Sequence, residues 1–447
     1  MKKHRSPWYS LAMATEAPVT VQSMAFKGYG VSRRNGKVVF VPYVIAGEEV
    51  WIEMVEEKKD YSIGRPMRIS SPSSWRVEPG CPYFGVCGGC QWQHIDPRVQ
   101  GDFKRDILKE ILQRLGRLDD IPPISVIPSP QPYGYRTRVQ LKVAGGLIGY
   151  YRERSHHLVD IDRCPIAHSL VNQALASLRQ VRTLFSTADE LEINVSPEEG
   201  KGIFILRSNR NGPPPRLRLQ ELLNDHPVVK GAALMAKKGS HHWGDPSLTY
   251  TVSFQRAGKT ADVRFRTSPE SFFQVNPEQN QALVQTVLDF ADLTGNERVL
   301  DLYAGMGNFT LPLAMEAQEV LGIEENGRAV EDGRLNVLQN RIDRCRFICG
   351  KVEEVIRKIE DRRWDVIVLD PPRAGCRPIA SLMADRKPQK LVYVSCDPAT
   401  LARDLHLLLE KGYVLQALTL IDLFPQTYHM EVVGLLRLPS PGSNSGH

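Results

Sequence analysis

The stretch LVYVSCDPATLARD, residues 391–404, predicts the fold of the C-terminal half of the chain. Its apolar beginning, LVYV, is typical of a buried strand, and Asp397-Pro398 is a pattern with which helices begin. In an open α/β sheet, ligands bind at the carboxyl ends of the strands, so Cys396 stands where chemistry takes place. A thiol there is either a nucleophile or a buried small hydrophobic residue, and the second is the commoner case for a single cysteine. The residues at the other predicted strand ends help to decide between these two roles of Cys396.

Strands and helices alternate from residue 281 onward, which predicts a mostly parallel, doubly wound sheet. Its first strand, VLDLY, is followed by Gly305 and Gly307, which allow the backbone to approach a cofactor closely. The second strand ends in Glu324, about 20 residues after that loop, where a carboxylate would bind ribose hydroxyls. A dinucleotide site is the rival interpretation, but the loop has Thr310 where a further glycine would stand.

Two more carboxylates stand beside predicted strands. Asp370 ends the strand WDVIVLD and is followed by two prolines, so it is a positioned polar group rather than a solvated surface acid. Glu431 directly precedes the apolar strand in HMEVVGLL. Alone, it would be interpreted as a surface acid at a sheet edge, so its role depends on that of Cys396.

Residues 19–68 predict a small five-stranded β-barrel. Short strands that mix apolar and polar residues are separated by turn signals, among them Asn35-Gly36, which is typical of a hairpin. Residues 1–76 hold 12 Lys and Arg against 7 Asp and Glu. Barrels of this size with basic loops commonly bind single-stranded RNA, although a purely structural β-module would show the same pattern.

The eight cysteines are unevenly spread along the chain. Cys81, Cys87 and Cys90 form a C-x5-C-x2-C pattern with glycines inside it, and Cys164 precedes a proline. Clustered cysteines in a long cytosolic chain more often bind metal than form disulfides. The set is typical of an iron–sulfur cluster, and zinc held by four thiolates is the alternative. Three other cysteines lack the strand-end position of Cys396 and are expected to have packing roles: Cys345, Cys349 and Cys376.

The region between the barrel and the C-terminal half shows no catalytic constellation. Apolar residues at helical spacing predict a helix at residues 102–118, and a polar, strand-rich segment follows. Basic residues alternate there with tyrosines, which suits either RNA contact or a solvated surface. These basic residues are Arg136, Arg138, Arg152 and Arg154.

The whole-chain properties indicate a globular protein of two or three domains, because 447 residues exceed a single ordinary core. The net charge of +6 favours an acidic partner such as nucleic acid. No run of 18 apolar residues predicts a membrane span, and the basic N-terminus lacks the apolar core of a secretory signal. We therefore expect a cytoplasmic monomer. The polar tail at residues 440–447 is expected to be disordered.

Six motifs occur in the order seen in one enzyme family: ESFFQVN (270–276), DLYAGMGNF, the strand-end glutamate, DPPRAG, SCDPATLARD and HMEVV. Together they resemble the RNA uracil-5 methyltransferases of the 23S rRNA 5-methyluridine type. The resemblance covers nearly the whole chain. It implies a Rossmann-like class I methyltransferase sheet, an N-terminal TRAM-like barrel and a central α+β region that binds RNA.

The resemblance also implies domains and roles. The expected domains are a TRAM-like barrel at 16–76, a central domain with a 4Fe-4S cluster at 77–266 and an S-adenosylmethionine-dependent methyltransferase domain at 267–440, on which helix 102–118 packs. Cys396 would be the nucleophile and Glu431 the base. S-adenosylmethionine would be bound by Gln274, Tyr303, Glu324 and Asp370. The cluster would be held by Cys81, Cys87, Cys90 and Cys164.

The chemistry accounts for these residue types. Carbon 5 of uracil is a poor nucleophile until a thiolate adds at carbon 6, and a base must later remove the proton from carbon 5. A flipped uridine is expected, because the target carbon is inaccessible inside a stack.

Four alternatives remain at this point. DPP also occurs in adenine amino-methyltransferases, but these usually have an aromatic residue where Arg373 stands. Radical methylthiotransferases need a different cysteine spacing. A non-catalytic RNA-binding adaptor would have no need for these catalytic positions. The same chemistry on a tRNA T-loop uridine stays open.

Overall fold

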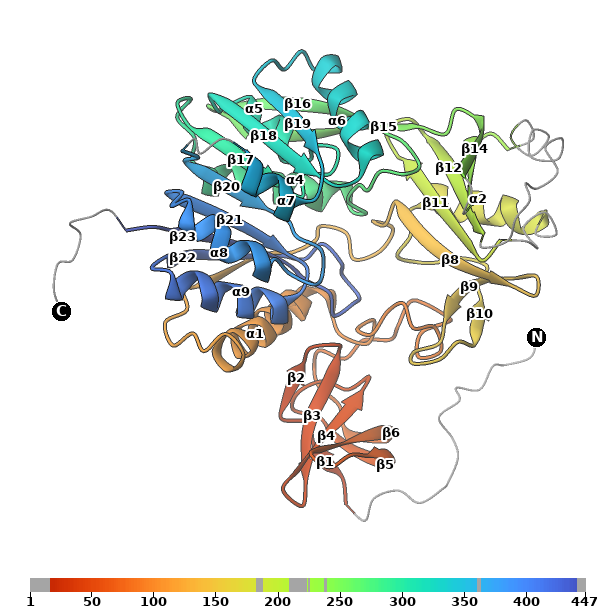
Figure 1. The fold of residues 1–447 in the computed structure, drawn as a ribbon. Helices are drawn as coiled ribbons and strands as arrows, with labels where there is room; N and C mark the ends of the chain where they lie inside the picture. Colours follow the sequence, from red (N-terminus) through yellow and green to blue (C-terminus); the bar gives the residue numbers. More distant parts are fainter. Residues whose placement is uncertain are drawn as a thin grey trace.

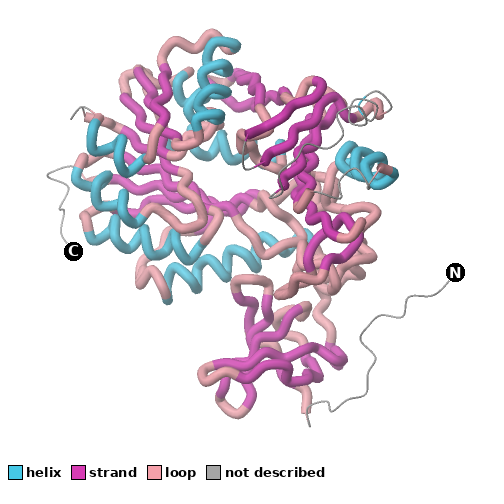
Figure 2. Tube along the Cα trace, turned by 45° about the vertical axis from the view of Figure 1, so that its right-hand side comes forward, coloured by secondary structure: helices cyan, strands magenta, loops and turns pink. Residues whose placement is uncertain are grey.

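The computed structural model describes residues 17–181, 188–208, 223, 226–236, 239–359 and 363–439, so the tail at 440–447 lies outside the described residues. The described strands form four sheets (Figure 1). Figure 2 shows cyan helices flanking the strands of the C-terminal body, whereas the N-terminal sheet at the bottom has no helix on it. Within the described ranges, no helix is long and apolar enough to cross a membrane.

The N-terminal sheet has six strands, one more than the sequence predicts. Its order is β1-β5-β6-β4-β3-β2. One strand, β2, has only three residues, so the alternation that marks a strand is not visible in it. The predicted hairpin at Asn35-Gly36 is confirmed: Arg34 pairs with Lys37, and both turn residues have positive φ, at 50° and 78°. The strands are β1 (Val19–Thr20), β2 (Ser23–Ala25), β3 (Tyr29–Arg34), β4 (Lys37–Pro42), β5 (Glu49–Glu57) and β6 (Tyr61–Ser71).

Helix α1 spans Pro97–Arg114, five residues earlier at its start than the sequence predicts. Asp96 caps it by accepting a hydrogen bond from the Arg98 N–H, and a proline occupies the first turn. Periodicity reveals only the buried stripe, which is concentrated in the second half of the helix. That stripe shares a hydrophobic core with α9 (Pro398–Glu410), so the helix packs on the C-terminal body.

The central region is a seven-stranded sheet of order β10-β9-β8-β11-β12-β13-β14. Helix α2 (Ser169–Gln180) packs against it. The strands are β8 (Arg138–Ala144), β9 (Leu147–Tyr151), β10 (Leu158–Asp160), β11 (Glu190–Ser196), β12 (Lys201–Ser208), β13 (Val229–Ala236) and β14 (Gly239–Gly244).

Two segments that the sequence assigns to the central domain join the C-terminal body instead. Strand β7 (Ile124–Ile127) pairs with β22 (Val414–Ile421) at the edge of the large sheet. The hairpin of β15 (Leu248–Arg256) and β16 (Lys259–Thr267) buries its apolar side against α4 (Pro277–Ala291). Alternation shows that a segment is a strand but not which neighbour it finds, so the sequence could not reveal this.

The C-terminal sheet confirms the predicted doubly wound architecture. Its order is β19-β18-β17-β20-β21-β23-β22-β7, with β17 to β21 parallel and β23 antiparallel to β21. Helices α1, α7, α8 and α9 share a core on one face, and α4, α5, α6 and the β15–β16 hairpin share one on the other. The remaining elements are β17 (Arg298–Leu302), α5 (Thr310–Ala314), β18 (Glu319–Glu324), α6 (Gly327–Gln339), β19 (Cys345–Cys349), α7 (Val352–Lys358), β20 (Val366–Leu369), α8 (Arg377–Asp385), β21 (Lys390–Ser395) and β23 (Glu431–Arg437).

This topology gathers the predicted site at one edge. The carboxyl ends of the parallel strands meet there, and antiparallel β23 brings its amino end to the same edge.

Candidate active site

Cys396 and Glu431 lie beside each other because of the strand register. Ser395 at the end of β21 pairs with Val432 of β23, so Cys396 and Glu431 occupy the next positions outward. Glu431 is 4% exposed, and Cys396 is half-buried. Asp397 fixes the turn after the thiol, since its carboxylate caps α9 by accepting from the N–H groups of Ala399 and Thr400, both at 3.0 Å.

Burial and neighbouring charges favour the neutral forms of Cys396 and Glu431. Burial, together with the charges of Glu431 and Asp370, raises the pKa of the Cys396 thiol to about 12. Burial and Asp370 together raise the pKa of Glu431 well above its usual range. Arg373 lowers both pKa values. A positive charge brought to this edge would therefore ionise groups that the protein alone holds protonated.

Arg373 is a site residue that the sequence interpretation used only to argue against an amino-methyltransferase. Its charge also lowers the pKa values of Tyr428 and His429. Burial, followed by Arg373 and more distant cations, lowers the pKa of His429 to about 4, so this imidazole is neutral at pH 7. A search for the cation that balances three predicted acids would have found Arg373 in the DPPRAG motif.

Asp301 is a second residue that the sequence interpretation missed. It is fully buried at the end of β17, and burial raises its pKa to about 7, with further contributions from Asp370 and Glu324. Thr310 Oγ1 donates to its carboxylate at 2.5 Å. Burial likewise raises the pKa of Asp370 to about 7. Asp301 thus supports the glycine loop from beneath.

The glycine loop is tied to Glu324. The Gly305 N–H donates to Glu324 Oε2 at 3.0 Å, and the Asn326 N–H donates to Oε1 at 2.7 Å. Tyr303, Gly305 and Gly307 have φ values of 63°, 56° and 99°, so the chain turns sharply here. A Cβ added to Gly305 would meet no atom within 4 Å, which leaves open space above the loop. The residues present fit a cofactor that bonds to Glu324 and lies against this backbone.

Gln274 belongs to a neighbouring loop. The Asn326 side chain donates to the Glu270 carbonyl oxygen at 3.1 Å, which joins the two loops. Gln274 lines a cavity of about 20 Å³ with Asn280, whose side chain exchanges hydrogen bonds with Asn308 of the glycine loop at 2.9 Å. The structure brings the other five predicted catalytic and cofactor residues to one edge and places Gln274 at its border.

Comparisons with known proteins show the family to which the chain belongs. Residues 254–438 match the family model described as tRNA (uracil-5-)-methyltransferase. An uncharacterized RNA methyltransferase of Clostridium tetani is 34% identical over 93% of this chain and 95% of its own length. One of Aquifex aeolicus is 35% identical over 94% and 98%. The chain belongs to the RNA uracil-5 methyltransferase family.

A solved structure extends the likeness to the whole architecture of this RNA methyltransferase. The Pyrococcus abyssi tRNA (uracil-54, C5)-methyltransferase, determined in complex with S-adenosyl-L-homocysteine, superposes with a TM-score of 0.75 at 26% identity. The match covers 94% of this chain and all of that one. The class I methyltransferase fold is thereby confirmed.

The early cysteines of this methyltransferase share a separate, mostly apolar cavity of about 50 Å³. Cys81, Cys87, Cys90 and Cys164 line it together with Tyr83, Phe84, Tyr150 and Ile161. Burial raises the pKa of each thiol, and to about 12 for Cys87 and Cys90. Across the described ranges, no group of three or more His, Cys, Asp or Glu is arranged to hold a single metal ion. The structure thus brings the four predicted ligand cysteines together around one cavity.

The prediction that the three other cysteines have packing roles is wrong for Cys349. Cys349 is exposed and ends β19, where it pairs in register with Glu324. Cys376 is buried and bonds to Tyr393, and Cys345 packs against the core of the sheet. The sequence missed the strand end because β19 has only five residues and begins and ends in cysteine.

Proposed function

We propose that this methyltransferase transfers a methyl group from S-adenosylmethionine to carbon 5 of one uridine in 23S rRNA. The observation that carries the proposal is the register that sets the Cys396 thiol beside the buried Glu431 carboxyl group. A nucleophile and a base on the same side of a flipped base are what this reaction needs. An RNA-binding adaptor has no need for this pair.

Cys396 acts first. Its thiolate adds to carbon 6 of the uracil, and the electron pair of the carbon 5–carbon 6 double bond makes carbon 5 nucleophilic. S-adenosylmethionine, when bound, supplies an electrophilic methyl group and leaves as S-adenosylhomocysteine. Arg373, the cation that lowers the pKa of Cys396, favours the thiolate in this step.

Glu431 acts second. Its carboxylate takes the proton from carbon 5, the electrons of that bond restore the double bond, and the bond to the Cys396 sulfur breaks. The raised pKa of Glu431 makes it a stronger base once it is ionised, and a sulfonium charge near Asp370 would promote that ionisation.

Four residues would hold the methyl donor: Gln274, Tyr303, Glu324 and Asp370. The support is strongest for Glu324, because two backbone N–H groups orient its carboxylate toward the open side of the glycine loop. Its oxygens suit ribose hydroxyls. Tyr303 is half-buried in the same loop.

A 4Fe-4S cluster would be held by Cys81, Cys87, Cys90 and Cys164. Their shared cavity and the surrounding apolar side chains support this assignment. Thiolate ligation would join the irregular segment that follows β6 to the central sheet, which is a structural task.

The RNA would be bound by the basic N-terminal sheet and the exposed tip of the central sheet. Arg68 lies over the Trp51 ring at 5.4 Å, Arg154 lies over the Tyr29 ring at 5.3 Å, and both Arg152 and Arg154 are exposed. Arg138 is committed to the buried Glu192 at 2.9 Å and is not part of this surface. We keep the barrel at 16–76, whereas the limits 77–266 and 267–440 change, because β7 and the β15–β16 hairpin belong with the C-terminal sheet. The protein is proposed to work as a cytoplasmic monomer.

A tRNA uridine is the second candidate substrate. The Pyrococcus abyssi relative named for tRNA uracil-54 matches this chain over its full length, so the shared architecture does not separate the two RNAs.

The test is methyl transfer from labelled S-adenosylmethionine to 23S rRNA fragments and to tRNA, followed by nucleoside analysis. We expect 5-methyluridine in the rRNA and none with Cys396→Ala. Product in tRNA alone would replace the substrate but keep the mechanism. A methylated amino group, or an active Cys396→Ala enzyme, would reject the mechanism.

A further inference from the structure

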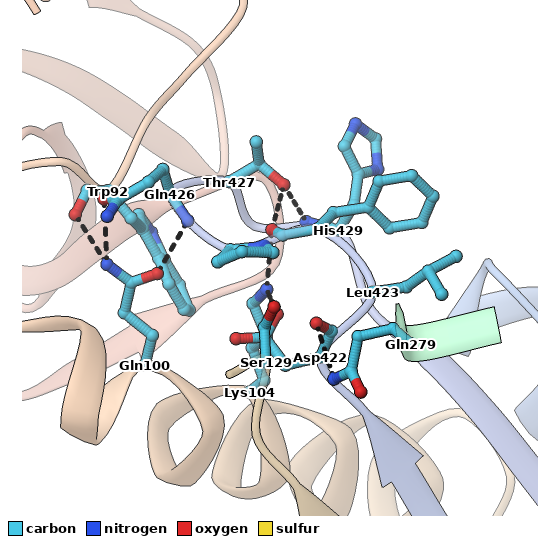
Figure 3. A network of polar contacts seen from close by, with 12 residues as sticks. Trp92, Gln100, Lys104, Ser129, Gln279, Asp422, Leu423, Gln426, Thr427 and His429 are labelled. Carbon is cyan, nitrogen blue, oxygen red and sulfur yellow. Dashed lines mark hydrogen bonds and ion pairs between the residues drawn. The ribbon is translucent and has the colours of Figure 1, made fainter. Parts of the chain in front are cut away.

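The loop that leads to Glu431 is held by helix α1, by helix α4 and by the backbone of residues 91–92 (Figure 3). It spans residues 422–430, between β22 and β23. Lys104 of α1 binds the Asp422 carboxylate at 2.6 Å and the Phe424 carbonyl oxygen at 3.1 Å. Gln279 of α4 donates to the Asp422 carbonyl oxygen at 3.1 Å. Such a dense set of anchors indicates that the position of this loop matters.

Gln426 is the strained residue of the loop. Its φ is 69°, in the left-handed region that a non-glycine residue rarely adopts. Its side chain is 1% exposed, so the surroundings of Gln426 are protein rather than solvent. A conformation of this kind persists only where the surroundings impose it.

The side chain of Gln100, in α1, holds Gln426 in this conformation. Its Oε1 accepts from the Gln426 N–H at 2.8 Å, and its Nε2 donates to Gln426 Oε1 at 3.1 Å. The same Nε2 group also donates to the carbonyl oxygens of Trp92 and Ile95, at 3.1 and 2.9 Å. Gln100 is fully buried, and both ends of its amide are used.

The segment after Cys90 also forms hydrogen bonds with Gln426. The N–H groups of Gln91 and Trp92 both donate to the Gln426 carbonyl oxygen, at 3.2 and 3.0 Å. The peptide groups on both sides of Gln426 are therefore fixed by residues more than 300 positions away in sequence.

The path from Gln426 to Glu431 is short and constrained. Thr427 Oγ1 donates to the Phe424 carbonyl oxygen at 2.8 Å and accepts from the His429 N–H at 3.2 Å. Met430, the residue before Glu431, is fully buried. A change in the backbone at Gln426 must be absorbed within these few residues, at the edge where Arg373 and Cys396 lie.

We propose that Gln100 is a positioning residue for Glu431: by clamping Gln426 in the left-handed conformation, it sets the loop so that the base reaches the carbon 5 proton. This inference rests on the proposed function, because it concerns the second half of that reaction. It adds that a residue of α1, outside the catalytic motifs, controls release of the RNA from Cys396.

The test is Gln100→Leu, which keeps the approximate volume and removes all four hydrogen bonds. A misplaced Glu431 should leave the methylated uracil attached to Cys396, so the covalent protein–RNA band on a denaturing gel should increase about tenfold. Single-turnover methyl transfer to the RNA should fall by less than about threefold, because the first step does not need the base. A purely structural defect would lower both together.

Three variants make the outcome decisive. Glu431→Gln is the positive control and should accumulate the adduct. Asn336→Leu removes a different buried amide, which bonds to both backbone groups of Arg266 at 2.8 and 3.1 Å, and should not change the ratio of adduct to product. Gln426→Gly in the Gln100→Leu background removes the cost of positive φ and should reduce the adduct.

Adduct in Gln100→Leu, relieved by the glycine, supports the inference. If Glu431→Gln accumulates adduct but Gln100→Leu does not, or if the glycine brings no relief, the clamp is rejected while the proposed function stands. If Glu431→Gln itself forms no adduct, the assignment of Glu431 as the base falls, and the clamp falls with it.

Discussion

The two edges of the C-terminal sheet differ in how their charged side chains are paired and how far they are exposed to solvent. At the amino edge, Arg298 and Arg346 share Glu319 at 2.7 and 3.1 Å, and Lys390 and Arg437 both lie near Asp292. These side chains are 13–65% exposed, so water screens them. Each of the two carboxylates at this edge thus lies near two cations, and the exposure of these pairs keeps their cost to the fold low.

At the carboxyl edge the acids are buried and repel one another. Asp301 and Glu431 are buried, and Asp370 raises the pKa of both, whereas Arg373 lowers that of Glu431. The same strands therefore end in screened ion pairs on one side and in acids with raised pKa values on the other. Perturbed acids gathered at one strand end indicate function, because a fold selected only for stability would pair or expose them.

The largest expected effect is at the thiol of the carboxyl edge. Cys396→Ala should lower methyl transfer by more than about 10³-fold, since removal of a nucleophile abolishes the covalent route. Cys345→Ala, at the amino end of β19, is the matched control and should keep activity within about twofold. Steady-state rates with labelled S-adenosylmethionine measure both. Equal losses in the two variants would remove the distinction between the edges.

The next largest effect concerns the buried cation near the carboxyl edge. Lys104→Met leaves the Asp422 carboxylate buried without its partner, which should cost about 3–5 kcal/mol of stability and lower Tm by several degrees. The double variant Lys104→Met with Asp422→Asn should recover part of this loss, because no charge is then left unpaired. Thermal unfolding measures both. A double variant less stable than Lys104→Met would contradict the pairing argument.

A smaller effect should appear as a pH dependence. The native pKa of Asp370 is raised to about 7, so its neutral form stabilises the fold at low pH, and this contribution is lost as pH rises through 7. Asp370→Asn should therefore stabilise the protein at pH 8 by about 1–2 kcal/mol and leave stability at pH 4 nearly unchanged. Unfolding midpoints measured from pH 4 to 8 give the difference. Its absence at pH 8 would show that the carboxyl group is not perturbed.

The smallest effect is expected at the amino edge. Arg346→Ala removes an ion pair whose arginine is 60% exposed, and such pairs contribute less than about 1 kcal/mol. Neither Tm nor methyl transfer should change measurably. A large loss of activity here would show that the amino edge also has a functional part.

Much of the fold and of the site could be predicted from the sequence, because both depend on local sequence patterns. The alternation of strands and helices predicted the parallel sheet, and strand ends predicted Glu324, Asp370 and Cys396 as neighbours. Arg373 and Asp301 were missed since neither stands out by residue type, and only proximity to several acids marks them. The strands of the N-terminal sheet were undercounted by one, because the three residues of β2 show no periodicity.

The sequence by itself determined the order of the elements, the strand-end residues and the family, because these depend on local periodicity and on motifs that survive in the linear chain. Only the tertiary structure decided that β7 and the β15–β16 hairpin belong to the C-terminal body, and that Gln100 clamps Gln426. Partners so far apart in sequence are chosen by packing and by the need to satisfy buried polar groups. No local pattern records that choice.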